Sequence, residues 1–149
     1  MIESSTDILA QRLLEARVLE HRRRVSLLKT ARSGTLDLPC SHVLVCHAEN
    51  GSLRAAKLDS CLRHLADSKP SGGDHPSIKK TSFRKSHVYG PASLPKTIKN
   101  SLRAKAIYRL LVRLAKSAGE PVIGAICAEF ISQEQALLDM LTSTPSAEQ

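Results

Sequence analysis

Residues 93–118 read SLPKTIKNSLRAKAIYRLLVRLAKSA, and this stretch decides the fold class. Ser93 followed by Pro95 is typical of a helix start, since a serine oxygen can accept from the free amides of the first turn and proline suits that turn. No other Pro and no Gly interrupts the stretch. Its apolar residues share one helical face: Ile107, Leu110, Leu111, Leu114 and Ala118. The pattern predicts a helix over 93–118.

A second helix is expected directly after it. Gly119 is typical of a helix end, and Pro121 of the first turn of the next helix. Apolar residues then recur at helical spacing as far as Leu141. Two helices joined by so short a connection form an antiparallel hairpin, so we expect a C-terminal helical hairpin from 93–118 and 121–141.

The N-terminal part predicts a helix over 5–32, which starts after Ser4 and ends at Gly34. Two apolar stripes run along it. The residues of the outer stripe alternate in spacings of four and three: Leu14, Val18, His21, Val25 and Leu28. The residues of the second stripe are Leu9, Leu13, Ala16 and Leu27. Since alternating spacings are typical of helix pairing, we expect the outer stripe to mediate self-association in a homodimer.

The middle of the chain is interpreted as mixed. The β-branched run at 41–48 predicts a short strand, followed by a turn and a helix over 52–67. Gly and Pro at 68–77 predict a flexible loop, and 80–89 is expected to be a second strand or an ordered basic loop. The expected fold is therefore mostly α, of the α+β class. It has about four helices in a single domain over 1–141 and a frayed polar tail over 142–149.

Composition narrows the class of protein further. The chain has 149 residues, only 3% aromatic residues and no Trp, which favours packed helices over an all-β sandwich. No apolar run approaches the length of a membrane span, and the first residues are acidic and polar, unlike a signal peptide. We therefore expect an intracellular protein, cytoplasmic or nuclear. Its four Cys are then free thiols or ligands rather than disulfides.

Positive charge is concentrated in one third of the chain. The formal net charge is +8, yet residues 69–118 hold twelve Lys and Arg against one acid, Asp74. Residues 119–149 hold five acids and no Lys or Arg. A basic block of this density is typical of nucleic-acid binders, although a solvated basic face is the common alternative.

The strongest candidate for nucleic-acid contact is the segment 79–89. It combines cations for phosphates with aromatic rings on which bases can stack. The residues concerned are Lys79, Lys80, Phe83, Arg84, Lys85 and Tyr89. The alternative is a basic edge strand whose rings face the core.

The second candidate is the polar face of helix 93–118, which carries Lys105, Arg109 and Arg113. Such a face can follow a phosphate backbone. It could instead be neutralised by Glu129, Glu134 or Asp139 of the following helix, or be solvated.

Metal binding and enzymatic chemistry have weak support. The weak zinc candidates are Cys40, His42, Cys61 and His64, with Cys46 and His47 as substitutes for the first pair. No paired Cys-x-x-Cys occurs, and a buried cysteine is the ordinary alternative. No phosphate-binding glycine loop or nucleophile motif occurs either, so we expect neither a cofactor nor an enzyme. Arg22, Arg23 and Arg24 before Ser26 fit a site for a basophilic kinase.

These patterns predict a non-enzymatic nucleic-acid-binding protein, with RNA slightly favoured over DNA because exposed rings suit unstacked bases. Its size and charge suit a small regulatory or accessory protein, such as those of viruses or mobile elements. The alternative is a protein-interaction adaptor, whose basic block binds an acidic partner and whose N-terminal helix mediates assembly.

Overall fold

The structure is a computed structural model that describes residues 4–68 and 92–143. Four helices make up almost all of this part of the chain: α1 (Ser5–Arg32), α2 (Leu38–Asp67), α3 (Leu94–Ser117) and α4 (Pro121–Ser143). No strand occurs among these described residues. The prediction of a mostly helical protein is confirmed.

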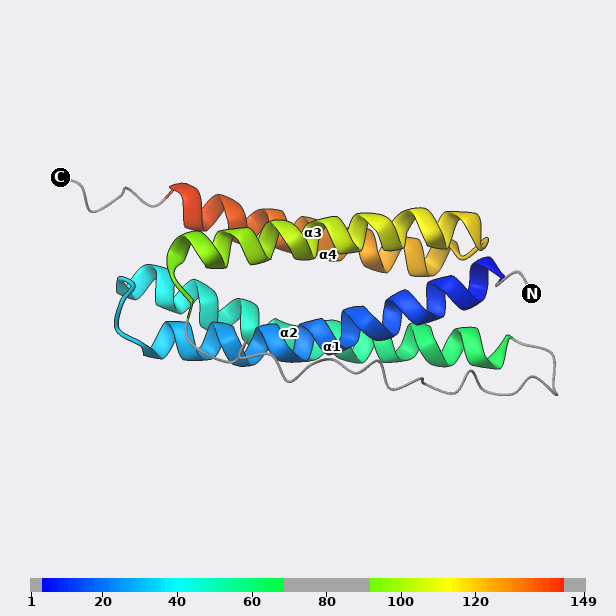
Figure 1. Ribbon diagram of the computed structural model, residues 1–149, viewed down its shortest axis with the longest axis horizontal. Coiled ribbons are helices and arrows are strands. Elements are labelled where there is room, and N and C mark those ends of the chain that lie inside the picture. Colours follow the sequence, from blue (N-terminus) through cyan, green and yellow to red (C-terminus); the bar gives the residue numbers. More distant parts are fainter. Residues whose placement is uncertain (1–3, 69–91, 144–149) are drawn as a thin grey trace.

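The helices form two hairpins that pack against each other (Figure 1). Within the hairpins α1 pairs with α2 and α3 with α4, and between them α1 faces α3 and α2 faces α4. α2 ends at one end of the bundle and α3 begins at the other, so α3 runs parallel to α2 and antiparallel to α1. The result is a four-helix bundle with a single long connection, at 69–91.

Local signals in the sequence explain where the helices begin and end. The side chains of Ser4, Asp37 and Ser93 accept hydrogen bonds from the backbone amides of the first turns of α1, α2 and α3. Gly34 and Gly119 follow the ends of α1 and α3 with φ of 75° and 71°. Because that left-handed conformation favours glycine, both turns depend on a glycine at these positions.

The predicted strand at 41–48 is wrong, because these residues lie inside α2. Asp37 caps that helix well before Val43 and Val45, whose β-branched side chains suggested a strand. The turn expected around Gly51 is helical as well, and Gly51 is buried. Packing along the whole of α2 therefore overrides the local strand and turn preferences. The second predicted strand, at 80–89, lies outside the described residues.

The buried positions alternate in spacings of four and three on every helix, as in a coiled coil, with Ala48 of α2 and Leu138 of α4 as additional buried residues. On α1 they are Leu9, Leu13, Ala16, Glu20, Arg23, Leu27 and Thr30. On α3 they are Thr97, Ser101, Ala104, Tyr108, Leu111 and Ala115. Several of these residues are polar or charged. The apolar pattern alone therefore placed the face of α3 too far round the helix, and Leu110 is 39% exposed.

Two apolar clusters fill the ends of the core. The larger contains Tyr108 and Phe130, whose rings meet edge to face with centroids 5.2 Å apart. The smaller is built around Leu27, Leu44 and Leu137. Between them the buried positions are polar, and this layer is the most distinctive feature of the interior.

Candidate nucleic-acid interface and the buried polar layer

Glu134 is the centre of the polar layer between the two apolar clusters. Its side chain is completely buried and meets groups from all three other helices. Its Oε2 lies 3.1 Å from Nε2 of His47 on α2, and its Oε1 accepts a hydrogen bond of 2.9 Å from Ser101 on α3. Arg23 on α1 forms a buried ion pair with the same carboxylate. One side chain of α4 thus holds the four helices in register.

Glu20 forms the second buried carboxylate site. Its Oε2 lies 3.1 Å from Nε of Arg54 on α2, and its other oxygen accepts a hydrogen bond from the hydroxyl of Tyr108 on α3. Arg54 also donates to the Gln133 side chain at 3.0 Å and to the carbonyl of His47 at 2.9 Å. The two carboxylates and two guanidiniums balance in charge, as burial requires.

The environment sets the protonation of this layer. Burial alone would raise the pKa of Glu134, but the hydrogen bond from His47 and the charge of Arg23 outweigh it and lower that pKa to about 2. Burial lowers the pKa of His47 despite the opposing effect of Glu134. Burial also raises the pKa of the Tyr108 hydroxyl well above its ordinary value, and Glu20 adds to the effect. Glu134 is therefore ionised at neutral pH while His47 is neutral.

Arg23 offers more donors than the interior accepts. Its Nε and Nη2 are buried and find no hydrogen-bond partner among the described residues. Glu134 holds the guanidinium by its remaining nitrogen. Since an unpaired buried charge is costly, the position of Arg23 depends on Glu134.

The outer surface of the bundle is polarised in charge. α1 carries seven Lys and Arg against three acids, and α3 carries seven against none, so these two adjacent helices have a net charge of +11. α2 has three of each kind, and α4 has three acids and no Lys or Arg. One side of the bundle, made by α1 and α3, is therefore strongly cationic.

The cations of α3 carry no compensating carboxylate within the described parts of the chain. No ion pair there includes any of them. Arg109 and Arg113 are exposed, and Lys105 is half-buried and donates to Gln135 of α4. Four more are exposed along the same helix: Lys96, Lys99, Arg103 and Lys116.

The acids of α4 are occupied elsewhere. Glu129 pairs with Lys57 of α2 at 3.4 Å, and Asp139 accepts a hydrogen bond from Gln135 at 2.8 Å. Glu134 lies inside the core. Within the described residues, no acid of α4 therefore forms an ion pair with a cation of α3.

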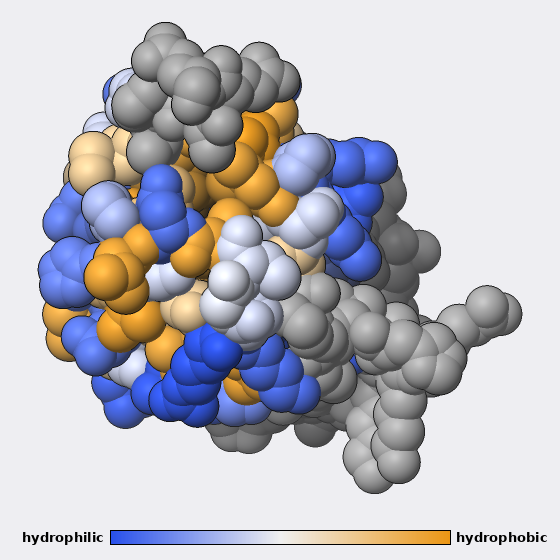
Figure 2. All heavy atoms as spheres, turned by 90° about the vertical axis from the view of Figure 1, so that its left-hand side faces the viewer, coloured by the Kyte–Doolittle hydropathy of each residue, from blue (hydrophilic) through white to orange (hydrophobic). Residues whose placement is uncertain are grey.

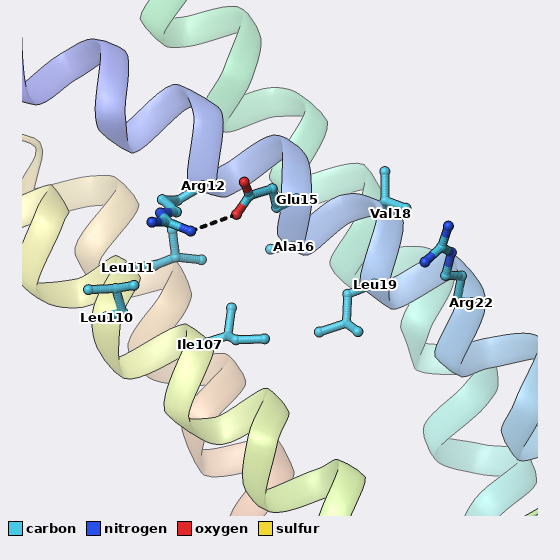
Figure 3. A pocket seen from close by; sticks show the side chains of 9 residues that line it. All are labelled: Arg12, Glu15, Ala16, Val18, Leu19, Arg22, Ile107, Leu110 and Leu111. Atoms are coloured by element: carbon cyan, nitrogen blue, oxygen red, sulfur yellow. Dashed lines mark hydrogen bonds and ion pairs between the residues drawn. The ribbon is translucent and has the colours of Figure 1, made fainter. Parts of the chain in front are cut away.

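An apolar groove opens between α1 and α3 within this cationic side (Figure 3). It has a volume of about 200 Å³. Its apolar lining comes from Ala16, Val18, Leu19, Ile107, Leu110 and Leu111. Arg12 and Arg22 line it from α1, and Arg12 is paired with Glu15 at 3.0 Å. Sequence reasoning missed the groove, because it depends on how α1 lies against α3.

A second apolar area lies at the end of the bundle where α2 begins and α4 ends, the end that faces the viewer in Figure 2. Leu38 is 85% exposed there and Met140 53%. A shallow hollow between α2 and α4 includes Pro39, Val43 and Met140.

The structure separates the predicted metal ligands. Cys40 and Cys61 lie 21 residues apart on the same helix, about 32 Å at 1.5 Å per residue, so they cannot share an ion. His64 Nε2 lies 3.1 Å from Glu120, and His42 lies 3.6 Å from Sγ of Cys46. The described residues contain no cluster of three or more His, Cys, Asp or Glu side chains that could hold a metal ion. The proposed four-ligand zinc sets are therefore wrong.

Other predicted sites have varied outcomes. The outer stripe of α1 is half-buried at Leu14, Val18, Val25 and Leu28, and its His21 is exposed. The kinase candidate Ser26 is half-buried on α1, and its carbonyl accepts from Thr30 at 2.8 Å. The six candidate residues of segment 79–89 lie outside the described residues.

Among the described helices, none combines the length and the apolar character that a membrane span needs.

Comparisons with known proteins bear on the fold alone. No family model matches the sequence, and no curated protein matches it significantly. The structure is similar to the crystal structure of a protein from Xanthomonas campestris pv. campestris, with a TM-score of 0.71 and 23% sequence identity. The match covers 93% of this chain and 88% of that one. The two proteins thus share nearly the whole bundle.

Proposed function

We propose that this protein is a non-enzymatic nucleic-acid-binding protein and that the cationic side formed by α1 and α3 contacts the nucleic acid. The observation that carries the proposal is α3, which has seven cations, no acid and no ion pair within the described residues. Exposed guanidinium and ammonium groups along one helix can contact successive phosphates of a nucleic-acid backbone.

The dimensions of this surface suit a polymer. Lys99 and Lys116 are 17 residues apart on α3, about 26 Å along the helix axis. A duplex rises about 3.4 Å per base pair, so the row of cations matches roughly seven or eight base pairs or a comparable length of single strand. A regulatory or accessory role stays part of the proposal, and RNA is slightly favoured over DNA because the rings of Phe83 and Tyr89 suit unstacked bases. The candidate residues in 79–89 remain a prediction within the same proposal.

The test is a salt titration of binding. A triple variant with Arg103, Arg109 and Arg113 changed to Gln should bind a labelled 20-nucleotide RNA more weakly. The plot of log affinity against log salt should also become flatter, by about 0.7 for each lost phosphate contact with a single strand. The control has Arg17, Lys57 and Arg63 changed to Gln, and of these Arg17 lies on α1 but pairs with Asp59 of α2. The control loses the same charge, but Arg17 and Lys57 are already in ion pairs and Arg63 donates to Ser60.

If both triple variants lose affinity equally, only net charge matters and the α3 surface is not the site. If the unchanged protein binds no nucleic acid at low salt, the proposed function is wrong. Neither triple variant should unfold the protein, since all six substituted cations are exposed.

The alternative is a protein-interaction adaptor, and one observation favours it. Leu102 and Leu110 are 53% and 39% exposed among the cations of α3. Apolar side chains surrounded by charge are common in protein interfaces. An acidic protein partner would bind with weaker salt dependence than nucleic acid and would leave the purified protein with an ordinary absorbance ratio.

Self-association through the outer stripe of α1 belongs to the proposal as well. That stripe keeps coiled-coil spacing and is separate from the buried positions of α1. The homodimer therefore remains a prediction with its own test.

A further inference from the structure

We propose that the groove between α1 and α3 holds an unpaired base of a single-stranded nucleic acid while the arginines around it hold the neighbouring phosphates. This inference rests on the proposed function and adds that single strands are preferred over duplexes. It follows from an apolar hollow that is lined by two arginines and lies on the cationic side of the bundle.

The floor of the groove is apolar and partly open to solvent. Leu19 of α1 and Ile107 of α3 lie on its two sides, and Leu110 lies beside them on α3 (Figure 3). Leu110 is 39% exposed, so apolar surface is available without moving a helix. The flat face of a base is a suitable occupant, since it is largely apolar and is hidden inside a duplex.

Arginines surround this hollow on both helices. Arg12, Glu15 and Arg22 belong to its lining on α1, and Arg12 is paired with Glu15 at 3.0 Å, so a phosphate at Arg12 competes with that ion pair. On α3, Arg103 precedes Ile107 by four residues, and Arg113 follows Leu110 by three. Residues at these spacings are neighbours on a helix surface, so both side chains start beside the groove. Guanidinium groups can bind phosphate oxygens and also stack on a base.

Charge complementarity decides between occupants. The two helices that form the groove carry a net charge of +11, which attracts an anionic occupant to the groove. An occupant must therefore be anionic as well as partly apolar. In a single strand these two properties alternate at the spacing of a nucleotide, whereas a duplex presents phosphates with its base faces covered. The groove thus favours single strands.

The experiment compares three 20-nucleotide probes of the same length by fluorescence anisotropy: a single-stranded RNA, the corresponding RNA duplex and a single-stranded DNA. The full-length protein is used at low salt. We expect single strands to bind more tightly than the duplex. Single-stranded RNA and single-stranded DNA should both bind more tightly than the duplex, because both expose unpaired bases.

Two groove variants test the apolar contact. Leu110→Gln and Leu19→Gln should each weaken single-strand binding by about tenfold, the effect of losing one buried apolar contact, and should leave duplex binding unchanged. Leu102→Gln is the matched control. It changes a residue that is 53% exposed on the same helix, does not line the groove, and should leave both affinities unchanged. Circular dichroism melting confirms that the variants fold, and Leu110→Gln is the decisive variant because Leu110 is already partly exposed.

The outcomes separate the two proposals. If the unchanged protein binds none of the probes, the proposed function itself is wrong. Binding that is equal for single strands and duplex, and unaffected by Leu110→Gln, overturns the base-binding groove and leaves the cationic surface intact. A competing acidic peptide that displaces the single strand from the unchanged protein but not from Leu110→Gln would assign the groove to a protein partner and also overturn the inference.

Discussion

Nε2 of His47 lies 3.1 Å from Oε2 of Glu134, and this contact joins α2 to α4 inside the bundle. Arg23 of α1 and Ser101 of α3 reach the same carboxylate. A layer of this kind contributes little net stability, since ion pairs lose solvation when buried. It does fix which residues face each other, because any sliding of one helix leaves a buried charge unpaired.

Glu134→Ala should destabilise the fold strongly. It leaves Arg23 buried without its carboxylate and His47 and Ser101 without their acceptor. The free energy of unfolding should fall by about 3–5 kcal/mol, the usual cost of breaking a buried pair by removing one partner. Urea denaturation followed by circular dichroism measures this loss.

Glu129→Ala is the control for that measurement. Glu129 lies on the same helix and pairs with Lys57, but both side chains are about half exposed. The change should therefore alter stability by less than about 1 kcal/mol. Equal losses in the two variants would mean that the buried layer has no special role.

Stability should fall as the pH decreases from 7 toward 5, and His47 is the reason. Burial lowers the pKa of His47 below its ordinary value of 6.5, so below that pH the unfolded chain takes up a proton that the folded protein resists. Each pH unit in this window should cost up to about 1.4 kcal/mol. Denaturation at several pH values should give a smaller slope for His47→Gln, and an unchanged slope would exclude His47 as the cause.

Glu134 extends the same dependence to lower pH. Its pKa is lowered to about 2 in the folded protein, from an ordinary value of 4.5. The stability that it contributes is complete above pH 4.5 and is lost as the pH falls toward 2. Acid unfolding should therefore begin in this window.

The thiols should react at very different rates. Cys46 is exposed, whereas Cys40, Cys61 and Cys127 are buried, and burial raises the pKa of Cys127 to about 12. A thiolate is the reactive form, so a disulfide reagent at pH 8 should label about one thiol per chain quickly. Cys46→Ser should remove the fast phase. Fast labelling of more than one thiol would mean that the bundle opens readily.

Local signals in the sequence predict most helix ends and the C-terminal hairpin. Ser4, Ser93 and Gly119 marked helix ends that the structure has at those positions, within one residue. The C-terminal hairpin followed from the short break before Pro121. These features depend on residues that are near one another in the sequence, which is why single-sequence reasoning finds them.

The polar layer could not be found in this way. Glu20, Arg23 and Glu134 occupy buried positions of the heptad pattern, and charged residues are normally assigned to the surface. Reading only apolar residues on α1 therefore drew attention to the outer stripe around Val18 and Val25. The complete spacing of four and three on α1 becomes visible only when Glu20 and Arg23 are counted as buried.

The last prediction concerns that outer stripe. Val25 is half-buried and does not belong to the buried positions of α1, so Val25→Asp should preserve the fold. If the stripe pairs two copies, the unchanged protein should be a dimer by light scattering at high micromolar concentration, and Val25→Asp a monomer. Exposed or half-buried cations of α1 near the stripe should repel each other across such a pair, among them Arg22, Arg24, Lys29 and Arg32. Added salt should therefore strengthen the dimer while it weakens nucleic-acid binding. A monomer at every salt concentration would contradict self-association.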